Sequence, residues 1–236
     1  MSDNVVEIRT LDTAEEMATV GRLLQQVWGS PTPLVEIDLL QAISHSGGYV
    51  SGAYDHGNLI GASFGFLGRY GADLCLHSHV TGILPGVQHA GLGKAIKEHQ
   101  REWAAGNDIP WITWTFDPLV RTNAWFNVER LGVRVARYLV NFYGPMGDSI
   151  NVGDETDRLL VAWASDPGVG RPVAPTGARV VEVATPEDIV LLRRTQSPDA
   201  LEWRERVRDE LEPLVNSGGT VVGFTRDGAY QVAVAD

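Results

Sequence analysis

The sequence is poor in cysteine, in positive charge and in long apolar runs. Cys75 is the only cysteine among 236 residues, so no internal disulfide can form, and this fits a reducing, cytoplasmic compartment. The 30 acidic residues outnumber the 19 lysines and arginines and give a net charge of −11. Nucleic acids and anionic membranes bind basic surfaces, so we expect neither as a partner. The polar first residues and the lack of about 20 consecutive apolar residues predict no signal peptide and no membrane span.

The length of 236 residues allows one large domain or one domain with an appendage, and the 44% of hydrophobic residues is ample for a core. Hydrophobic periodicity and turn residues predict the order β-α-α-β-β-β-α-β-α-β-β. The expected strands are 5–11, 48–54, 59–67, 74–84, 111–116, 133–143 and 158–163. The expected helices begin at a Thr13–Glu16 capping box, at 35, after the glycine loop near 93, and at 122.

A stretch rich in proline and glycine, 165–177, predicts a linker. Beyond it the pattern favours a strand over 178–183, a helix starting near Pro186, a helix over 200–215 and a hairpin that turns at Asp227-Gly228. The sequence therefore predicts a main domain over 1–164, the linker, and a small α+β extension over 178–236.

The most informative stretch, 80–103, excludes two familiar phosphate loops. The form G-x-x-x-x-G-K-[ST] needs a glycine where Gln88 stands and a hydroxyl where Ala95 follows Lys94. The dinucleotide form G-x-G-x-x-G needs a third glycine where Ile96 stands.

The same stretch still has the order strand, glycine-bearing loop, helix. Gly91 and Gly93 let the backbone approach a ligand closely, and the first amides of the helix point towards phosphate oxygens. The sequence thus predicts a phosphate-bearing cofactor; the alternative is a glycine turn before an ordinary helix. Apolar spacing places Leu92, Ala95, Ile96, His99 and Trp103 on the buried face of that helix and Lys97 off it.

The motif Q-x-x-G-x-G at 88–93, after a strand and Pro85, resembles the acyl-CoA loop of the GNAT superfamily of N-acetyltransferases, and the chain as a whole resembles larger bacterial members of it. The resemblance covers about 5–164 and implies a GNAT-like α+β or α/β fold, a mixed and splayed central sheet flanked by helices. It also implies acetyl-CoA or another acyl-CoA as co-substrate. The residues that it implies around this cofactor are Thr81, Gly82, Ile83, Gln88, His89, Ala90, Gly91, Leu92, Gly93, Lys94 and Asn123.

A second segment, 121–133, resembles the family's N-x-x-A-x-x-L-Y-x-x-x-G-F motif, with Ala124 and Gly132 in register. Arg121 stands where the family has Asn, and Val128 stands where it has the Tyr that commonly protonates the departing thiolate. A different acid, a water molecule or the solvent must therefore protonate the thiolate. Tyr138 is a candidate acid, with core packing as its alternative role.

Amide formation from a thioester needs a neutral amine and hence a base. His77 and His79 lie two apart, so we expect them on one face of the strand, with Thr81. Asp117 is a further candidate base or amine anchor, unless it forms a turn with Pro118. No third ligand at a suitable spacing accompanies the histidines, so no metal is expected.

Arg121 is a candidate for holding a substrate carboxylate, because guanidinium binds carboxylate with two parallel hydrogen bonds. Its alternative is a surface ion pair. The sequence therefore predicts an acyl-CoA-dependent N-acyltransferase that transfers acetyl or another short acyl group, succinyl included, to a small amine such as an amino acid. The alternatives are a weakly active acyl-CoA-binding regulatory module and a protein lysine acetyltransferase. A homodimer is expected from the resemblance alone.

Overall fold

The computed structural model describes residues 6–87, 91–144 and 154–235. The chain divides into two compact units. Unit 1 is Met1–Thr113 with Ala164–Asp166, and unit 2 is Trp114–Trp163 with Pro167–Asp236. Each unit is described by itself.

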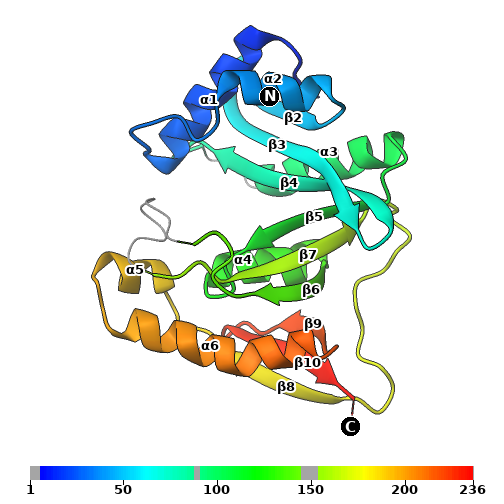
Figure 1. The fold of residues 1–236 in the computed structure, drawn as a ribbon, viewed down its shortest axis with the longest axis vertical. Coiled ribbons are helices and arrows are strands. Elements are labelled where there is room, and N and C mark those ends of the chain that lie inside the picture. The colour runs from blue at the N-terminus through cyan, green and yellow to red at the C-terminus, as the bar shows by residue number, and fades with distance from the viewer. Residues whose placement is uncertain (1–5, 88–90, 145–153, 236) are drawn as a thin grey trace, which may run out of the picture. The chain divides into compact units, whose positions relative to one another are not determined.

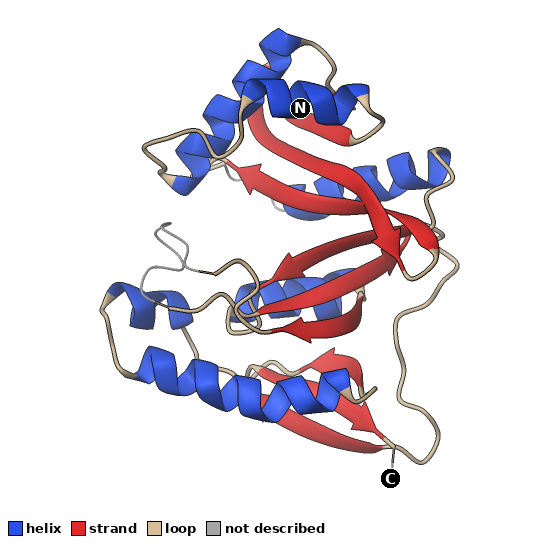
Figure 2. Ribbon diagram, in the orientation of Figure 1, coloured by secondary structure: helices blue, strands red, loops and turns tan. Residues whose placement is uncertain are grey.

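Unit 1 has four antiparallel strands with helices on both faces (Figures 1 and 2). Its elements are β1 (Glu7–Thr10), α1 (Ala14–Trp28), α2 (Ile37–His45), β2 (Tyr49–Asp55), β3 (Asn58–Tyr70), β4 (Asp73–Ile83) and α3 (Leu92–Gly106), followed by the start of β5 (Trp111–Phe116). β5 is parallel to β4, so the sheet is mixed, with the strand order β1-β2-β3-β4-β5-β7-β6.

Two apolar clusters hold the helices of unit 1 to opposite faces of its strands. The predicted capping box begins α1, with the Thr13 hydroxyl accepting from the Glu16 amide and the Glu16 carboxylate accepting from the Thr13 amide. The first cluster joins α1 and α2 to the sheet through Met17, Val20, Leu24, Leu40, Val50, Ala62 and Phe64. The second joins α3 to the other face through Ala53, Ile60, Leu92 and Ile96.

A β-bulge at His79 interrupts the ladder between β3 and β4. Phe64 pairs with Val80, whereas the next residue of β3, Gly65, pairs with Ser78. A bulge leaves one residue unpaired and shifts the alternation of faces. Near the same point the parallel ladder ends, because β4 pairs with β5 only from Cys75–Trp111 to His77–Thr113.

Unit 2 contains the rest of the chain. After β5 come α4 (Arg121–Trp125), η1, a turn of π-helix (Phe126–Leu131), β6 (Arg134–Leu139) and β7 (Arg158–Ala164). The C-terminal residues form β8 (Arg179–Ala184), α5 (Ile189–Arg194), α6 (Asp199–Asn216), β9 (Thr220–Phe224) and β10 (Ala229–Val234), and their strands make a separate antiparallel sheet in the order β8-β10-β9.

Two expected elements of unit 2 differ in the structure. The helix expected over 122–131 is divided into α4 and η1. The strand expected over 133–143 ends at Leu139, because Asn141 takes a left-handed conformation with φ of 44° and its amide donates to Asp157. Both differences arise from tertiary contacts that hydrophobic periodicity does not encode.

The C-terminal residues share one interior with residues 114–163. Tyr230 is fully buried, and its hydroxyl donates to the Pro118 carbonyl at 2.9 Å. The Phe224 amide donates to Glu129 at 2.7 Å. Unit 2 contains residues on both sides of the predicted domain boundaries at 164 and 178. That an acetyltransferase core ends at these boundaries remains a prediction.

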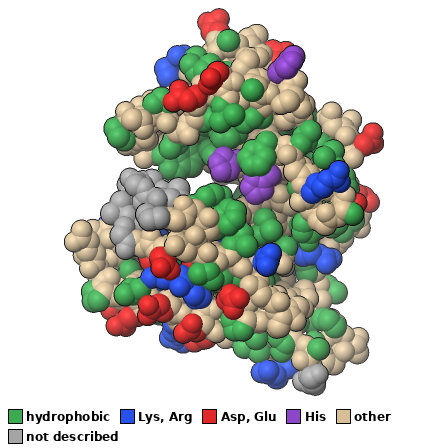
Figure 3. All heavy atoms as spheres, in the orientation of Figure 1, with side chains coloured by type: hydrophobic (Ala, Val, Ile, Leu, Met, Phe, Trp, Pro, Cys, Tyr) green, Lys and Arg blue, Asp and Glu red, His purple; other side chains and the backbone are tan. Residues whose placement is uncertain are grey.

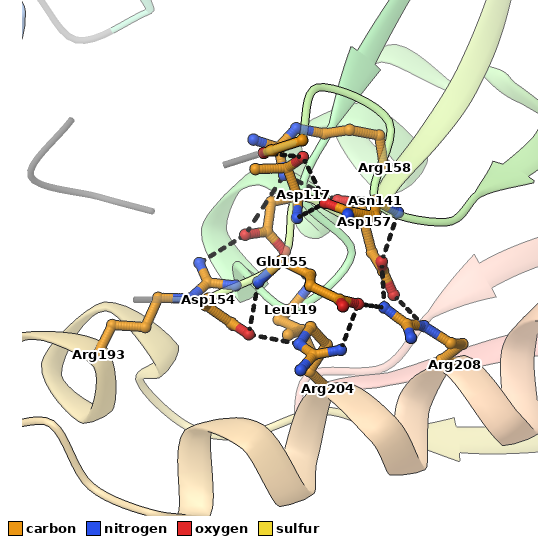
Figure 4. A network of polar contacts seen from close by, with 12 residues as sticks. Asp117, Leu119, Asn141, Asp154, Glu155, Asp157, Arg158, Arg193, Arg204 and Arg208 are labelled. Atoms are coloured by element: carbon orange, nitrogen blue, oxygen red, sulfur yellow. Dashed lines mark hydrogen bonds and ion pairs between the residues drawn. The ribbon is translucent and has the colours of Figure 1, made fainter. Parts of the chain in front are cut away.

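A network of ion pairs connects the helices of the extension to the residues around β7 (Figure 4). Arg193 bridges Asp117 at 2.6 Å and Asp154 at 3.0 Å, and Arg204 pairs with the other oxygen of Asp154. Arg208 contacts Asp157 at 2.6 Å. Figure 3 shows acidic and basic side chains interleaved at the surface of this unit, while Arg193 and Arg204 are buried. Buried charges of this kind are stable only when paired.

Asp154→Asn should destabilise unit 2 by about 3–5 kcal/mol, because each of two buried guanidinium groups loses a charged partner, leaving Arg193 with Asp117 and Arg204 with Glu155. The measurement is urea unfolding. The matched control is Glu210→Gln, which removes an exposed pair with Arg206 at 3.0 Å and should cost under about 1 kcal/mol. Equal losses for the two variants would contradict a special role for the buried network.

Candidate functional site

The N-terminus of α3 has the geometry of an anion-binding site. Gly91 precedes the helix with φ of 93°, a conformation that favours glycine, and no side chain caps the helix among the described residues. The amides of the first turn, at Leu92, Gly93 and Lys94, are those that a helix leaves without an internal partner. Lys94 is paired with Glu98 at 3.1 Å on the exposed side. Gln88, His89 and Ala90 lie outside the described residues.

The edge of β4 beyond the ladder with β5 can hold an extended chain. The Leu84 amide donates to Ile60 of β3, and backbone groups alternate along an antiparallel pair. Thr81 and Ile83 therefore turn their backbone groups away from β3. Packing explains the glycine at position 82, because a Cβ there would lie 2.7 Å from the Trp28 ring.

His77 and His79 lie together, as expected, among aromatic side chains of β3. The His77 ring is 5.2 Å from the Phe66 ring and 6.2 Å from the His79 ring, and His79 is 5.6 Å from Phe64. Phe64 belongs to the cluster with α1 and α2. The two histidines therefore occupy the α1 and α2 face of the sheet.

Thr81 does not share that face, and the expectation that it would is wrong. Its hydroxyl is 2.8 Å from Ser63, which accepts a hydrogen bond from Gln100 of α3 at 2.7 Å. Thr81 thus lies beneath α3. The bulge at His79 explains the difference, because it shifts the alternation between His77 and Thr81 by one residue.

Both histidines are biased towards the neutral form. Burial, with smaller contributions from His79 and Lys97, lowers the pKa of His77 from 6.5 to about 4. Partial burial also lowers the pKa of His79. The Nδ1 atom of His77 is 3.1 Å from the Thr113 hydroxyl, which fixes the ring and directs Nε2 away from that contact. Both rings are therefore neutral at pH 7, and a neutral imidazole has one nitrogen that can accept a hydrogen bond from an amine.

Lys97 is buried between α3 and β4, so the expectation that it lies off the buried stripe of α3 is wrong. Only 7% of its surface is exposed, and its Nζ donates to the Ser78 hydroxyl at 2.8 Å. Burial lowers its pKa from 10.5 to about 7. The buried side of α3 is formed by Leu92, Ile96, Lys97, Gln100 and Ala104. In the sequence, Leu92, Ile96, Gln100 and Ala104 recur every four residues, and this spacing could have indicated the buried face.

Two candidate catalytic residues, Asp117 and Tyr138, are buried in the interior of unit 2. Asp117 is buried, pairs with Arg193, and accepts from the Leu119 amide at 2.9 Å, which is the turn contact considered as its alternative. The Tyr138 hydroxyl donates to Asp157 at 2.7 Å, and burial and Asp157 raise the pKa of Tyr138 far above its ordinary value. Such a phenol is a poor proton donor at neutral pH, so the geometry adds no support to the catalytic role predicted for it.

Arg121 and Asn123 lie on α4. The Arg121 Nε donates to the Thr185 hydroxyl at 3.2 Å, and another guanidinium nitrogen donates to the Thr185 carbonyl at 2.5 Å. The residue that directly follows β8 therefore occupies much of this group. Asn123 is exposed, and its carbonyl accepts from Asn127. Carboxylate binding by Arg121 and cofactor binding by Asn123 remain predictions.

The structure therefore brings together in unit 1 the histidines, the strand 81–83 and the helix N-terminus, and places Asp117, Arg121, Asn123 and Tyr138 in unit 2. Within the described ranges no three His, Cys, Asp or Glu side chains gather as metal ligands would. In the same ranges no helix is long and apolar enough to span a bilayer.

Comparison with solved structures identifies the fold. The yncA protein of Salmonella typhimurium, solved with its cofactor acetyl-CoA, matches with a TM-score of 0.54 and 15% identity over 73% of this chain and 99% of its own. The ribosomal-protein-S18-alanine N-acetyltransferase of Escherichia coli matches with 0.53 and 15% over 70% and 97%. A GNAT-family acetyltransferase of Streptococcus pneumoniae matches with 0.52 and 14% over 68% and 99%.

No protein-family model and no curated protein sequence matches the chain. The structural matches define a mixed α/β protein of acyltransferase architecture. The chain has the fold of the GNAT acetyltransferases, which confirms the fold that the sequence resemblance implied. The matched proteins are covered almost end to end, whereas this chain has further residues.

The buried Lys97 should make stability depend on pH in a defined window. Its folded pKa of about 7 lies below the ordinary 10.5, so the unfolded chain binds more protons between these values. Stability should therefore rise with pH from about 7 to 10.5. Lys97→Met should remove this slope and raise Tm at pH 7 by a few degrees. Thermal unfolding across pH tests this, and a lowered Tm with an unchanged slope would contradict it.

Proposed function

We propose that the chain is an acyl-CoA-dependent N-acyltransferase that transfers an acetyl or other short acyl group to an amine. The observation that carries the proposal is the N-terminus of α3 after Gly91, which no described side chain caps. It lies next to the part of β4, from Ser78 to Ile83, that pairs only with β3 among the described residues. The first would bind the pyrophosphate of coenzyme A. The second would bind the pantetheine arm through the backbone of Thr81 and Ile83. The yncA protein, which shares the fold, binds acetyl-CoA.

The acceptor amine would lose its proton to one of the neutral histidines. An alkylamine has a pKa of about 10.4 and is protonated at neutral pH, so a base beside the thioester raises the reactive fraction. His77 Nε2 and His79 are the candidates, on the face that carries Phe64 and Phe66. A backbone amide of β4 that turns away from β3 would polarise the carbonyl oxygen.

The acceptor class is part of the proposal. We favour a small amine such as an amino acid, in a cytoplasmic protein that forms a homodimer. The acceptor named for the Escherichia coli protein of the same fold is an alanine of a ribosomal protein, so a peptide panel belongs in the test. Binding of coenzyme A without turnover on any acceptor would indicate the regulatory module instead.

Gly91→Ala should weaken binding of acetyl-CoA at least tenfold, because alanine disfavours φ of 93° and the first turn of α3 would shift. Isothermal titration with acetyl-CoA measures this. The control is Gly71→Ala, at another glycine with positive φ (63°) and open space around its Cβ, but in the β3–β4 turn. If both variants bind as the unmodified protein does, the helix N-terminus is not the phosphate site.

Removal of the base should change both rate and pH profile. His77→Gln or His79→Gln should lower kcat by about 10²-fold or more. Because a base works deprotonated, the rate should rise with pH through its pKa. For His77 that rise lies near pH 4, and for His79 below 6.5. His56→Gln, an exposed histidine beside Asp55, is the control. Unchanged rates in both test variants would exclude histidine as the base.

A further inference from the structure

Lys97 places a buried amino group next to the point where β4 loses its parallel partner. Its Nζ is 2.8 Å from the hydroxyl of Ser78, and Ser78 directly follows the last β4–β5 pair, His77–Thr113. Ser78 is 3% exposed and also directly precedes the bulge residue His79. The amino group therefore lies at the inner end of the β4 edge that runs to Ile83.

The proposed function places the leaving group of the reaction near this end. A cofactor with its phosphates at α3 and its arm along β4 would run from Ile83 towards Ser78, about 16 Å at 3.3 Å per strand residue. Transfer of the acyl group leaves a thiolate there, and this sulfur takes up a proton to give the free thiol. Val128 is a buried core residue of η1 and cannot supply one.

We propose that Lys97 is the source of this proton and that the Ser78 hydroxyl relays it to the sulfur, an inference that rests on the proposed acyltransferase function. The Ser78 oxygen accepts from Lys97, so its own hydrogen can donate to a third atom. Ser78 is the group that meets the sulfur, and Lys97 acts through it. The other proton-transfer groups proposed in unit 1, His77 and His79, accept a proton and do not donate one to the sulfur.

The step balances in atoms and charge. The histidine first releases to solvent the proton that it took from the ammonium form. The neutral amine nitrogen then forms a bond to the acyl carbon, and the proton that this nitrogen loses passes to the histidine base. The carbon–sulfur bond breaks with its electron pair on sulfur. The sulfur takes the Ser78 hydrogen as Ser78 takes a proton from the Lys97 ammonium. The products are the amide and coenzyme A, with Lys97 neutral and the histidine protonated; exchange with solvent then restores both.

Burial suits Lys97 to this exchange. A pKa of about 7 lets the ammonium form and give up its proton near neutral pH, and a donor works best when its pKa is near the operating pH. The ionisable groups of β4 are Asp73, Cys75, His77 and His79. On α3 itself they are Lys94, Glu98, His99, Arg101 and Glu102, and Tyr49 of β2 contacts His99. The Lys97 charge is felt at His77, whose pKa it helps to lower.

The decisive variant is Lys97→Arg, because arginine keeps the positive charge but does not give up its proton in proteins. Lys97→Met and Ser78→Ala remove the donor and the relay. Arg22→Met, at an exposed residue of α1, is the control. For each variant we would measure acetyl-CoA binding, kcat from thiol release with the best acceptor, and the pH dependence of kcat.

We expect both Lys97 variants to lose at least 100-fold in kcat, and Ser78→Ala at least tenfold, with acetyl-CoA dissociation constants within threefold of the unmodified protein. In the unmodified protein kcat should fall above about pH 7, since the donor must be protonated, and Lys97→Arg should lose this fall. Rates within threefold in Lys97→Met, or an unchanged alkaline fall in Lys97→Arg, would overturn the proposal.

A measurement independent of turnover uses the two lysines of the chain, Lys94 and Lys97. Carbon-13 NMR of lysine Cε gives one signal for each, and Lys97→Arg assigns them. The Lys97 signal should titrate near pH 7, and titration near the ordinary 10.4 would overturn the proposal. If the unmodified protein neither binds acetyl-CoA nor releases thiol with any acceptor, the proposed function has failed; normal turnover with unaffected Lys97 variants defeats only the proton relay.

Discussion

The bulge at His79, together with the end of the β4–β5 ladder at His77–Thr113, decides which side chains of β4 can act together. Before the bulge, Ser78 faces α3. After it, Thr81 also faces α3, while His77 and His79 face α1 and α2. Regular alternation thus places the proposed proton acceptors, His77 and His79, on one face of the sheet and the proposed relay residue, Ser78, on the other, and the unpaired residue brings Thr81 to the Ser78 face. This change of face follows directly after the last β4–β5 pair, His77–Thr113.

The interior beneath α3 is more polar than stability alone requires. Ser63, Ser78, Gln100 and Lys97 are all buried there, and the Gln100 carbonyl oxygen has no hydrogen-bond partner among the described residues. Burying a lysine costs free energy that an apolar side chain of similar length would not. Proteins keep such costs mainly where function needs the group. Of this polar set, Ser78 lies on β4 directly after the last β4–β5 pair, and Lys97 donates to it.

The extension has the opposite character, because its charges are paired and its contacts are structural. Arg193, Arg204 and Arg208 neutralise the carboxylates of Asp117, Asp154 and Asp157. Thr185 binds Arg121. Asp117 and Tyr138, which sequence reasoning considered for catalysis, are buried inside unit 2, and their catalytic roles remain predictions. Their residue types suit either role, and only their partners distinguish the two.

The sequence by itself determined the order of elements, the capping box of α1, the glycine-opened helix N-terminus and the GNAT fold, because these depend on local propensity, turn chemistry and short motifs. Tertiary structure decided the rest. The bulge, the burial of Lys97 and the partners of Asp117, Arg121 and Tyr138 come from residues distant in the chain. A period-2 or period-3.6 pattern gives the face of a side chain only while the ladder is regular, and it does not name the neighbour that the side chain meets.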